Sequence, residues 1–441
     1  MIQPLARLRS ARNADRGIIL TLLIITALAA VVAVLTKQYC RVNGWHGADQ
    51  HLHLCYSDFS ELFGTRGLAD RLFPFYTGLP QDQAMEYPAL QAVIAGLTAW
   101  AIPGTGFTPG RQLAYFDLNS LLSFVCWGVI VALVATMARR PKDALLVALA
   151  PGIILTSTLN WDLWAVLLCV LALWAFARRH VVLAGVFIGL GTAAKLFPLF
   201  LLGALLVVCW RSGKWRVFIT TTVTVVITWL VVNVPFMLTA FTEWSRFYTF
   251  SGDRDVSFSS MWLALAWTGL NGKAFGTLAN LCFGLLCLGI AWAGLTAPRR
   301  PRMAQLAFLI VAAFILTNKV YSPQFVMWLI PLYVLATPRW KGFWWWQAVE
   351  VYHWAAVWFE SAMINAGGYG TAADTAINLW YGTGIAAHMV AVVLICLRIL
   401  KDMRHPEQDP VRAAGETGFV DDPLGGVVDG AADARVWPVP R

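Results

Sequence analysis

Residues 17–36 read GIILTLLIITALAAVVAVLT, an unbroken stretch without a charged side chain. A stretch of this length crosses the roughly 30 Å hydrocarbon core of a bilayer as a single helix. Further apolar stretches follow along the chain, and 59% of all residues are hydrophobic. Because lipid offers no hydrogen-bond partners, each backbone amide must be bonded inside the protein, which favours helical spans. The sequence therefore predicts an all-α integral membrane protein with about 12 transmembrane helices.

The later apolar stretches alternate with short polar connections. They lie at residues 114–137, 142–158, 161–177, 181–194, 197–210, 217–239, 274–296, 303–318, 323–337, 342–364 and 376–398. One more apolar stretch, residues 88–103, is short, begins at Pro88 and ends at Pro103-Gly104. We interpret it as an interfacial or re-entrant helix rather than a span. With twelve spans, both chain termini lie on the same side of the membrane.

Short basic clusters separate many of these stretches. They are Arg7/Arg9/Arg12/Arg16, Arg139/Arg140/Lys142, Arg178/Arg179, Arg211/Lys214/Arg216, Arg299/Arg300/Arg302, Arg339/Lys341 and Arg398/Lys401/Arg404. Cytoplasmic loops of membrane proteins carry an excess of Lys and Arg, so we place all these clusters, and both termini, on the cytoplasmic side. The clusters also account for the net charge of +9. Because they form no basic domain, no nucleic-acid partner is predicted.

The domain organisation follows from this topology. Residues 1–16 form a cytoplasmic N-terminus, and residues 17–398 form a single transmembrane domain. Residues 37–113 form a large first extracytoplasmic loop, far longer than a simple connection requires. Residues 399–441 are rich in Gly, Asp and Pro and have no hydrophobic period, so we expect a disordered cytoplasmic tail.

The first extracytoplasmic loop contains two cysteines. Cys40 and Cys55 lie on the oxidising side of the membrane, where a disulfide between them would close a short loop. Spacing alone leaves this pairing open, because it does not show that the two sulfur atoms meet. The histidines between these cysteines match no standard zinc spacing. We therefore favour a solvated loop over a metal site and predict no cofactor.

Polar residues gather at five of the predicted outer loops. In chain order they are Asp58, Asp162, Lys195, Arg254 and the pair Asn318-Lys319. Lysine and arginine side chains bind phosphate groups, and a carboxylate such as Asp58 can act as a general base toward a hydroxyl. The sequence has no Gly-rich nucleotide-binding loop. This set therefore suggests group transfer from a lipid-phosphate donor at the membrane surface.

Each of these residues also has a purely structural interpretation. Aspartates such as Asp58 and Asp162 are favoured helix N-caps, and Lys195 could extend to the membrane interface as an anchor. Asn318 and Lys319 could simply end a span. Residue types and spacing do not decide between these interpretations.

Two ionisable residues fall inside a predicted span. Glu350 and His353 are three residues apart and therefore share one face of the helix expected over residues 342–364. Ionisable groups inside a bilayer are costly and by default suggest function. They either line a substrate cavity or pair with each other to hold the helices together, and we prefer the second interpretation.

Several short motifs follow one another along the predicted outer face. They are Tyr56-Ser57-Asp58, Glu86-Tyr87-Pro88, Asn160-Trp161-Asp162, GLGTAAKLFP at residues 189–198 and NKVYSPQF at residues 318–325. In combination they resemble the GT-C superfamily of polytopic membrane glycosyltransferases, over roughly residues 17–398. The chain looks most like glycosyltransferase family 87, the polyprenyl-phosphate-mannose-dependent α-mannosyltransferases of actinobacteria.

The resemblance implies roles for individual residues. The acidic residue of the first outer loop, here Asp58, corresponds to the catalytic base. The expected donor-binding residues are Lys195, Lys319, Tyr321, Gln324 and, from its charge, Arg254. The residues expected to support the site are Asp162, Glu86, Tyr87, Asn318, Glu350 and His353. The family is regarded as metal-independent, so the resemblance implies no metal ligand.

The implied activity is that of an inverting hexosyltransferase. It would move mannose from a polyprenyl-phosphate donor to a hydroxyl of an envelope glycolipid or lipoglycan on the extracytoplasmic face of the plasma membrane. A polyprenyl-phosphate-arabinose donor remains an alternative, because none of the motifs is specific for a hexose. A flippase or transporter of lipid-linked sugars also stays open, because the short apolar stretches on either side of Lys195 resemble the broken helices of transporters. The missing inverted repeat and the one-sided polar groups favour the transferase.

Overall fold

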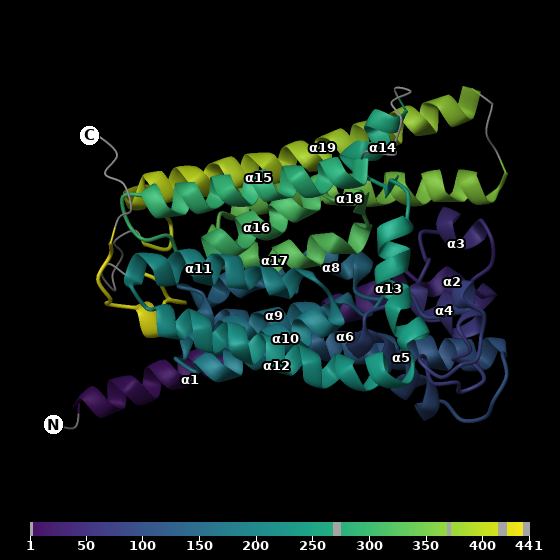
Figure 1. Ribbon diagram of the computed structural model, residues 1–441, viewed down its shortest axis with the longest axis horizontal. Coiled ribbons are helices and arrows are strands. Elements are labelled where there is room, and N and C mark those ends of the chain that lie inside the picture. The colour runs from purple at the N-terminus through teal and green to yellow at the C-terminus, as the bar shows by residue number, and fades with distance from the viewer. Residues whose placement is uncertain (1–2, 268–274, 368–371, 413–420, 435–441) are drawn as a thin grey trace.

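A computed structural model of the chain describes residues 3–267, 275–367, 372–412 and 421–434 (Figure 1). Nearly all of its regular structure is helical. The helices are α1 (Gln3–Leu35), α2 (Gln38–Asn43), α3 (Asp49–Leu52), α4 (Asp58–Thr65), α5 (Ala89–Ala101), α6 (Pro109–Met137), α7 (Leu145–Ala148), α8 (Pro151–Thr156), α9 (Asp162–Ala177), α10 (Val181–Ala194), α11 (Leu201–Ser212), α12 (Trp215–Thr239), α13 (Phe241–Asp253), α14 (Met261–Ala266), α15 (Phe275–Thr296), α16 (Met303–Thr317), α17 (Val326–Ala336), α18 (Trp340–Asn365) and α19 (Ala372–Arg404). Two short strands, β1 (Ser257–Phe258) and β2 (Val320–Tyr321), pair in parallel.

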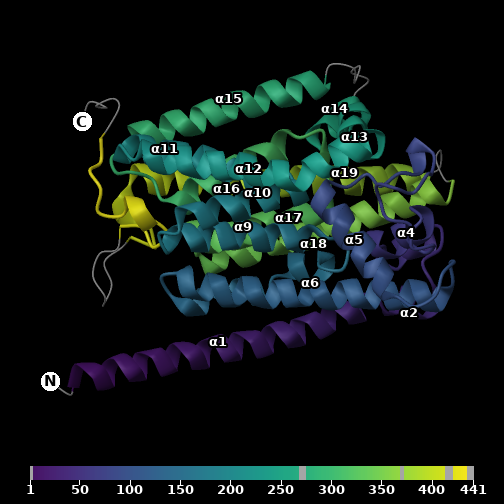
Figure 2. The same cartoon turned by 60° about the horizontal axis from the view of Figure 1, so that its bottom comes forward.

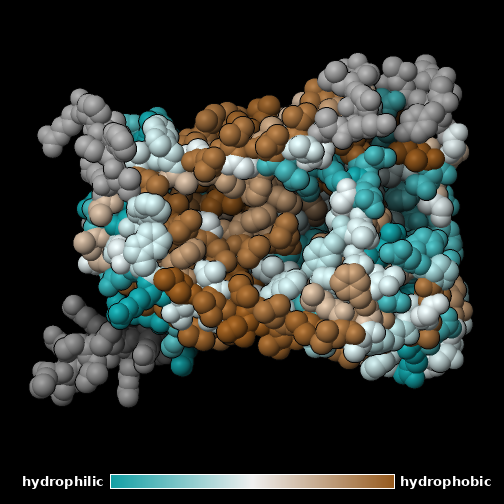
Figure 3. All heavy atoms as spheres, viewed as in Figure 1, coloured by the Kyte–Doolittle hydropathy of each residue, from teal (hydrophilic) through white to brown (hydrophobic). Residues whose placement is uncertain are grey.

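Five of the described helices are long and apolar enough to cross a membrane. They contain the segments Arg16–Leu35, Pro109–Met137, Trp215–Thr239, Phe275–Thr296 and Ile377–Arg404. Shorter apolar helices of 10–17 residues accompany them. On the face seen in Figure 3, an apolar band over the middle of the bundle separates two more hydrophilic ends. The chain is therefore a multi-pass, mainly helical membrane protein.

One of the expected spans differs from the structure. The stretch 142–158 forms a 3₁₀ turn and two short helices, α7 and α8, instead of one continuous helix. The second of these begins at Pro151, and Ala150 before it has a ψ of 114°. Proline disfavours helical backbone in the residue that precedes it, so the helix cannot run through this point. The exact number of membrane crossings stays a prediction.

The expected short helix within residues 88–103 forms α5, which packs against α6, α10 and α12. Its 13 residues extend only about 20 Å, which is less than the thickness of the hydrocarbon core.

The centre of the bundle is occupied by α16 and α17. Every residue of α17 is buried, and so are nearly all residues of α16. A helix that is apolar on all faces belongs in the core of a large protein or in a membrane, and here α6, α9, α11, α15 and α19 pack around the two central helices. The connection between these two central helices, residues 318–325, is consequently held at one end of the bundle.

Close packing of α10 against α12 positions a second connection. Gly185 and Gly189 lie one turn apart on α10 and face α12, where an added Cβ would come within 2.8 Å of the backbone oxygens of Thr221 and Val225. Small residues at this spacing allow two helix backbones to approach closely in membranes. The contact fixes the end of α10, and Lys195 follows immediately after it.

The first outer loop has a hydrophobic core of its own. Phe59, Phe63 and Phe75 are buried in it together with residues of α5 and α6. Cys40 and Cys55 form a disulfide at its edge, with a Cα–Cα distance of 5.9 Å. The loop is thus a compact structure of short helices, α2 to α5, seated on the end of α6 (Figure 2).

The beginning of α1 and the end of α19 lie at the same end of the bundle, and the first outer loop lies at the opposite end (Figures 1 and 2). This arrangement brings the start of α1 and the end of α19 together, and the side of the membrane on which the termini lie stays a prediction. It also puts the connections after α10, α13 and α16 at the end of the bundle that carries the first outer loop.

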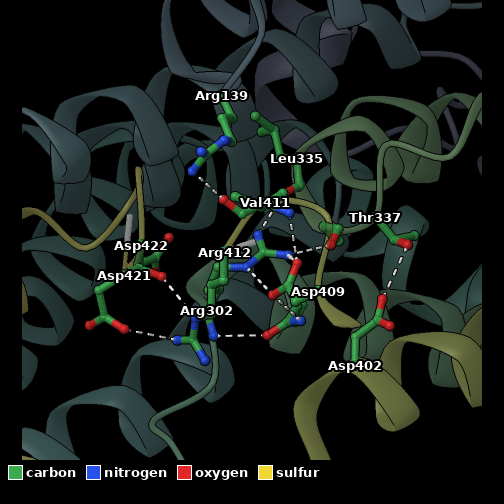
Figure 4. Close-up of polar contacts among 12 residues, drawn as sticks. Arg139, Arg302, Leu335, Thr337, Asp402, Asp409, Val411, Arg412, Asp421 and Asp422 are labelled. Carbon is green, nitrogen blue, oxygen red and sulfur yellow. Dashed lines mark hydrogen bonds and ion pairs between the residues drawn. The ribbon is translucent and has the colours of Figure 1, made fainter. Parts of the chain in front are cut away.

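The C-terminal tail differs from the expected disordered segment. Its described residues 405–412 and 421–434 dock onto the end of the bundle (Figure 4). Asp409 accepts hydrogen bonds at 2.7 and 2.9 Å from Arg302, Asp433 pairs with Arg211, and Leu424 is buried in the main core. Composition predicted disorder because the tail lacks a hydrophobic period. It cannot reveal that acidic tail residues meet arginines at helix ends far away in the sequence.

Candidate active site

Side chains from separate loops line one cavity of about 800 Å³. The predicted site residues in its wall are Asp58, Glu86, Tyr87, Lys195, Arg254, Asn318, Lys319 and Gln324. Apolar residues of α13, α15 and α16 complete the wall. The structure therefore brings together residues that are up to 266 positions apart in the chain, as the interval from Asp58 to Gln324 indicates.

Asp58 is held at the start of α4 by a capping interaction. Ser57 is the N-cap, and its Oγ accepts a hydrogen bond from the backbone N–H of Phe59 at 3.2 Å, as serine favours at this position. The same hydroxyl donates to the backbone oxygen of Thr158 at 2.7 Å, and the backbone N–H of Asp58 donates to Leu159 at 2.8 Å. These bonds tie the first outer loop to the turn before α9, so Asp58 has a defined place in the cavity wall.

Tyr87 connects Asp58 to that same turn. Its hydroxyl donates a hydrogen bond to the Asp58 carboxylate and accepts one at 3.1 Å from the side-chain amide of Asn160. Burial raises the pKa of the Asp58 carboxyl above its ordinary value, whereas the hydrogen bonds from Tyr87 and Tyr56 and the charge of Lys195 lower it. The carboxyl is thus a stronger base than a solvated aspartate, but hydrogen bonds still stabilise its charged form.

Lys195 is paired with Asp162 rather than extended to the membrane interface. Its Nζ lies 2.8 Å from Oδ1 of Asp162, and Oδ2 of the same carboxylate accepts a hydrogen bond at 2.9 Å from the indole N–H of Trp328. The ammonium group also lies 5.1 Å from the ring centroid of Tyr87, a cation–π contact. Asp162 is fully buried behind the cavity wall, and its ion pair fixes the position of the Lys195 ammonium group.

Arg254 and Lys319 come from two loops that the strands join. β1 pairs with β2, and the backbone N–H of Ser257 donates to the backbone oxygen of Lys319 at 3.1 Å. Arg254 donates to Ser257 Oγ at 3.0 Å, and Lys319 Nζ donates to the backbone oxygen of Gly252 at 2.7 Å. Within the described part of the chain, neither cation forms an ion pair with a carboxylate. Two positive charges of the cavity are therefore available to an anion.

Two amide side chains accompany these cations. The side-chain amide of Asn318 stabilises its own loop, because it donates a hydrogen bond to the backbone oxygen of Val320 at 2.9 Å. Gln324 is only 6% exposed, and its side-chain oxygen has no hydrogen-bond partner among the described residues. A buried acceptor of this kind is costly unless another group pairs with it, so Gln324 is suited to accept a hydrogen bond from a ligand.

Besides Asp162, three more predicted residues lie behind the cavity rather than in its wall. Tyr321 was expected to contact the donor, but side chains alternate along a strand, and it points away from its cavity-lining neighbours. Its hydroxyl donates to Glu350 at 3.2 Å. Glu350 also accepts from Trp346 at 2.9 Å, and the Nδ1 atom of His353 lies 3.8 Å from its carboxylate. This buried cluster joins α18 to the 318–325 connection, so the expected direct contact of Tyr321 with the donor does not fit the structure.

Some residues of the site carry no distinctive sequence signal. Arg66 forms a two-pronged ion pair with Glu86, at 2.7 and 2.9 Å. His388 lies 3.4 Å from Glu350, although it belongs to a different helix. Asn160 stands within a recognised motif, but its contact with Tyr87 depends on the folding of the first outer loop. Only the tertiary structure identifies the partners of these side chains.

The arrangement combines a buried carboxylate with cations that lack carboxylate partners. Such a site can remove a proton from a hydroxyl at Asp58 and stabilise negative charge on a phosphate near Arg254 and Lys319. Among the described residues, no group of three or more His, Cys, Asp or Glu side chains is placed to hold a metal ion.

Comparison with known proteins identifies a family. A crystal structure of ArnT from Cupriavidus metallidurans, bound to undecaprenyl phosphate, aligns with 87% of this chain and 77% of its own, with 13% sequence identity and a TM-score of 0.44. No curated protein sequence matches the chain. Residues 87–323, more than half of the 441 residues, match the sequence profile of glycosyltransferase family 87. The chain belongs to glycosyltransferase family 87.

Proposed function

We propose that this glycosyltransferase moves a mannose from a polyprenyl-phosphate donor to a hydroxyl of an envelope glycolipid or lipoglycan, with inversion at the anomeric carbon. The observation that carries the proposal is the composition of the 800 Å³ cavity. A single wall combines Asp58 with three cations, and the apolar side chains of α13, α15 and α16 lie beside them. Such a lining suits a ligand with a charged head and an apolar chain.

The proposed reaction needs only groups of this chain. Asp58 accepts the proton of the acceptor hydroxyl while that oxygen forms a bond to the anomeric carbon. The bond between this carbon and the phosphate oxygen breaks, and polyprenyl phosphate leaves with the electron pair. Arg254 and Lys319 stabilise the charge on the departing phosphate. Lys195 contributes from its fixed position beside Asp162, because separating a buried ion pair is costly.

The proposed orientation places the cavity outside the cell. The basic clusters lie at the C-terminal ends of α6, α9, α11, α15 and α19, or at the start of α18, at the end of the bundle opposite the cavity. Excess Lys and Arg mark the cytoplasmic side. Both termini are accordingly cytoplasmic, and the first outer loop and the cavity face the extracytoplasmic side of the plasma membrane.

Transfer of a labelled sugar by the purified protein tests this function. The protein is reconstituted in liposomes with polyprenyl-phosphate [¹⁴C]mannose and an envelope glycolipid extract. We expect label in the glycolipid fraction, and little or none when polyprenyl-phosphate arabinose replaces the donor. Movement of the donor across the bilayer without transfer would instead establish a flippase, and transfer of arabinose alone would reassign the donor.

Replacing Tyr87 with phenylalanine tests whether Asp58 is the general base. The hydrogen bond from Tyr87 lowers the pKa of Asp58, so its loss raises this pKa further. Since the deprotonated carboxylate is active, the acid limb of the profile of kcat/KM against pH moves to higher pH. The control is Tyr115→Phe, because Tyr115 is buried and donates to the backbone oxygen of Ala95, away from Asp58. Acid limbs that coincide in the Tyr87 variant and the wild type would contradict the assignment of Asp58 as the base.

A further inference from the structure

We infer that the ion pair of Arg66 and Glu86, together with the cavity-facing side of α4, forms a subsite for the sugar of the acceptor. Glu86 would bind hydroxyl groups of the sugar ring next to the one that Asp58 deprotonates. The inference rests on the proposed function and adds to it the location of the acceptor. The ligand class is a neutral glycan with neighbouring hydroxyl groups.

The geometry of α4 connects the base to this pair. Asp58 and Leu62 are one turn apart on the helix, and both line the cavity. Arg66 follows one more turn on, at the C-cap, and holds Glu86, which lines the cavity as well. Eight residues of helix span about 12 Å. The stretch of α4 from Asp58 to Arg66, the residue that holds Glu86, therefore has about the length of two linked sugar rings.

Electrostatics separates this wall from the donor phosphate. Asp58 and Glu86 are both carboxylates of the same cavity, and Glu86 contributes to raising the pKa of Asp58. A phosphate beside Asp58 would be repelled by like charge, and Glu86 does not attract one because Arg66 already neutralises its charge. Arg254 and Lys319, which suit the phosphate, belong instead to the loops joined by β1 and β2. A neutral polyhydroxyl compound is the substrate that fits beside the two acids.

Glu86 retains the capacity to bind such a compound. Arg66 donates one hydrogen bond to each carboxylate oxygen, at 2.7 and 2.9 Å. A carboxylate offers about four acceptor positions, so each oxygen can accept one more hydrogen bond. The Glu86 side chain is 19% exposed, which leaves it reachable from the cavity. Because the two-pronged pair fixes its orientation, the remaining acceptor positions are preorganised for two hydroxyl donors.

The test compares two acceptors in the same transfer assay. Octyl α-mannoside and octyl α-dimannoside are used with polyprenyl-phosphate [¹⁴C]mannose. For the wild type we expect a lower KM with the dimannoside. In Glu86→Gln we expect its KM for the dimannoside to rise about tenfold, with the KM for the donor within about twofold of the wild type. The double variant Arg66→Met/Glu86→Met leaves no unpaired charge in the wall and should show the same selective change.

A matched ion pair outside the cavity serves as the control. Arg41 and Asp117 also form a two-pronged pair, at 2.7 and 3.1 Å, which ties α2 to α6 and does not line the cavity. Asp117→Asn should leave both KM values unchanged. Equal effects of Asp117→Asn and Glu86→Gln would assign the Arg66–Glu86 pair a structural role only and overturn the inference. An unchanged KM in an active Glu86→Gln enzyme would do the same, whereas a wild type that transfers to no acceptor would contradict the proposed function itself.

Discussion

Asp58→Asn is expected to abolish sugar transfer while the protein stays folded. Asparagine keeps the size of the side chain and can still accept the hydrogen bond from Tyr87, but it cannot take a proton from the acceptor. General-base catalysis contributes about 100-fold to 10,000-fold in rate, so we expect a loss in that range. Transfer of labelled mannose measures the activity, and elution volume and thermal unfolding in detergent report the fold.

The matched control is Asp82→Asn. Asp82 is an exposed acidic residue of the same outer loop, in the 3₁₀ turn Gln81–Gln83, and it does not line the cavity. This variant should transfer mannose at the wild-type rate. Full activity in Asp58→Asn would remove Asp58 from the proposed mechanism, and an equal loss in both variants would point to the net charge of the loop instead.

Asp409→Asn is expected to lower the stability of the protein more than any other single change in the tail. Arg302 and Asp409 are 1% and 0% exposed, and their side chains pair with each other. Removing the charge of Asp409 leaves the buried Arg302 guanidinium without the carboxylate to which it donates two hydrogen bonds. Breaking a buried ion pair in this way costs about 3–5 kcal/mol. The thermal unfolding midpoint in detergent, measured against the wild type, should therefore fall clearly.

Two further variants separate this effect from a general sensitivity of the tail. Glu407 lies two residues away and its side chain is 68% exposed, so Glu407→Gln should leave the midpoint unchanged. The double variant Arg302→Met/Asp409→Leu replaces both charges by apolar groups and should recover part of the loss. If Asp409→Asn unfolded at the wild-type temperature, the tail would not be clamped to the bundle through this pair.

The family and the candidate base follow from local sequence. Apolar stretches of membrane-spanning length predict helices because the bilayer leaves few other ways to satisfy the backbone. Short motifs around Asp58, Lys195 and residues 318–325 resemble family 87, and the family match of residues 87–323 confirms that assignment. Predictions of this kind succeed because length, composition and motif order are properties of the chain itself.

Local sequence is less informative where the structure depends on backbone direction or on contacts between residues that are far apart in the chain. The break at Pro151 interrupts a stretch whose hydropathy alone suggests a span. Tyr321 belongs to a family motif, but strand alternation turns it toward Glu350 and away from the cavity. The composition of the tail predicts disorder, yet Asp409 forms an ion pair with Arg302, which is 107 residues away in the chain. In each case the outcome depends on a partner or a backbone direction that composition does not contain.

The sequence by itself predicted a helical membrane protein that resembles glycosyltransferase family 87, and it singled out Asp58 as the candidate base. Only the tertiary structure decided which charges of the cavity are already paired, as Lys195 is with Asp162 and Glu86 with Arg66, and which are open to a ligand. The physical reason is that membrane insertion depends on the apolar length of each segment. The state of a charged side chain depends instead on neighbours within a few ångströms, and folding brings these together from distant parts of the chain.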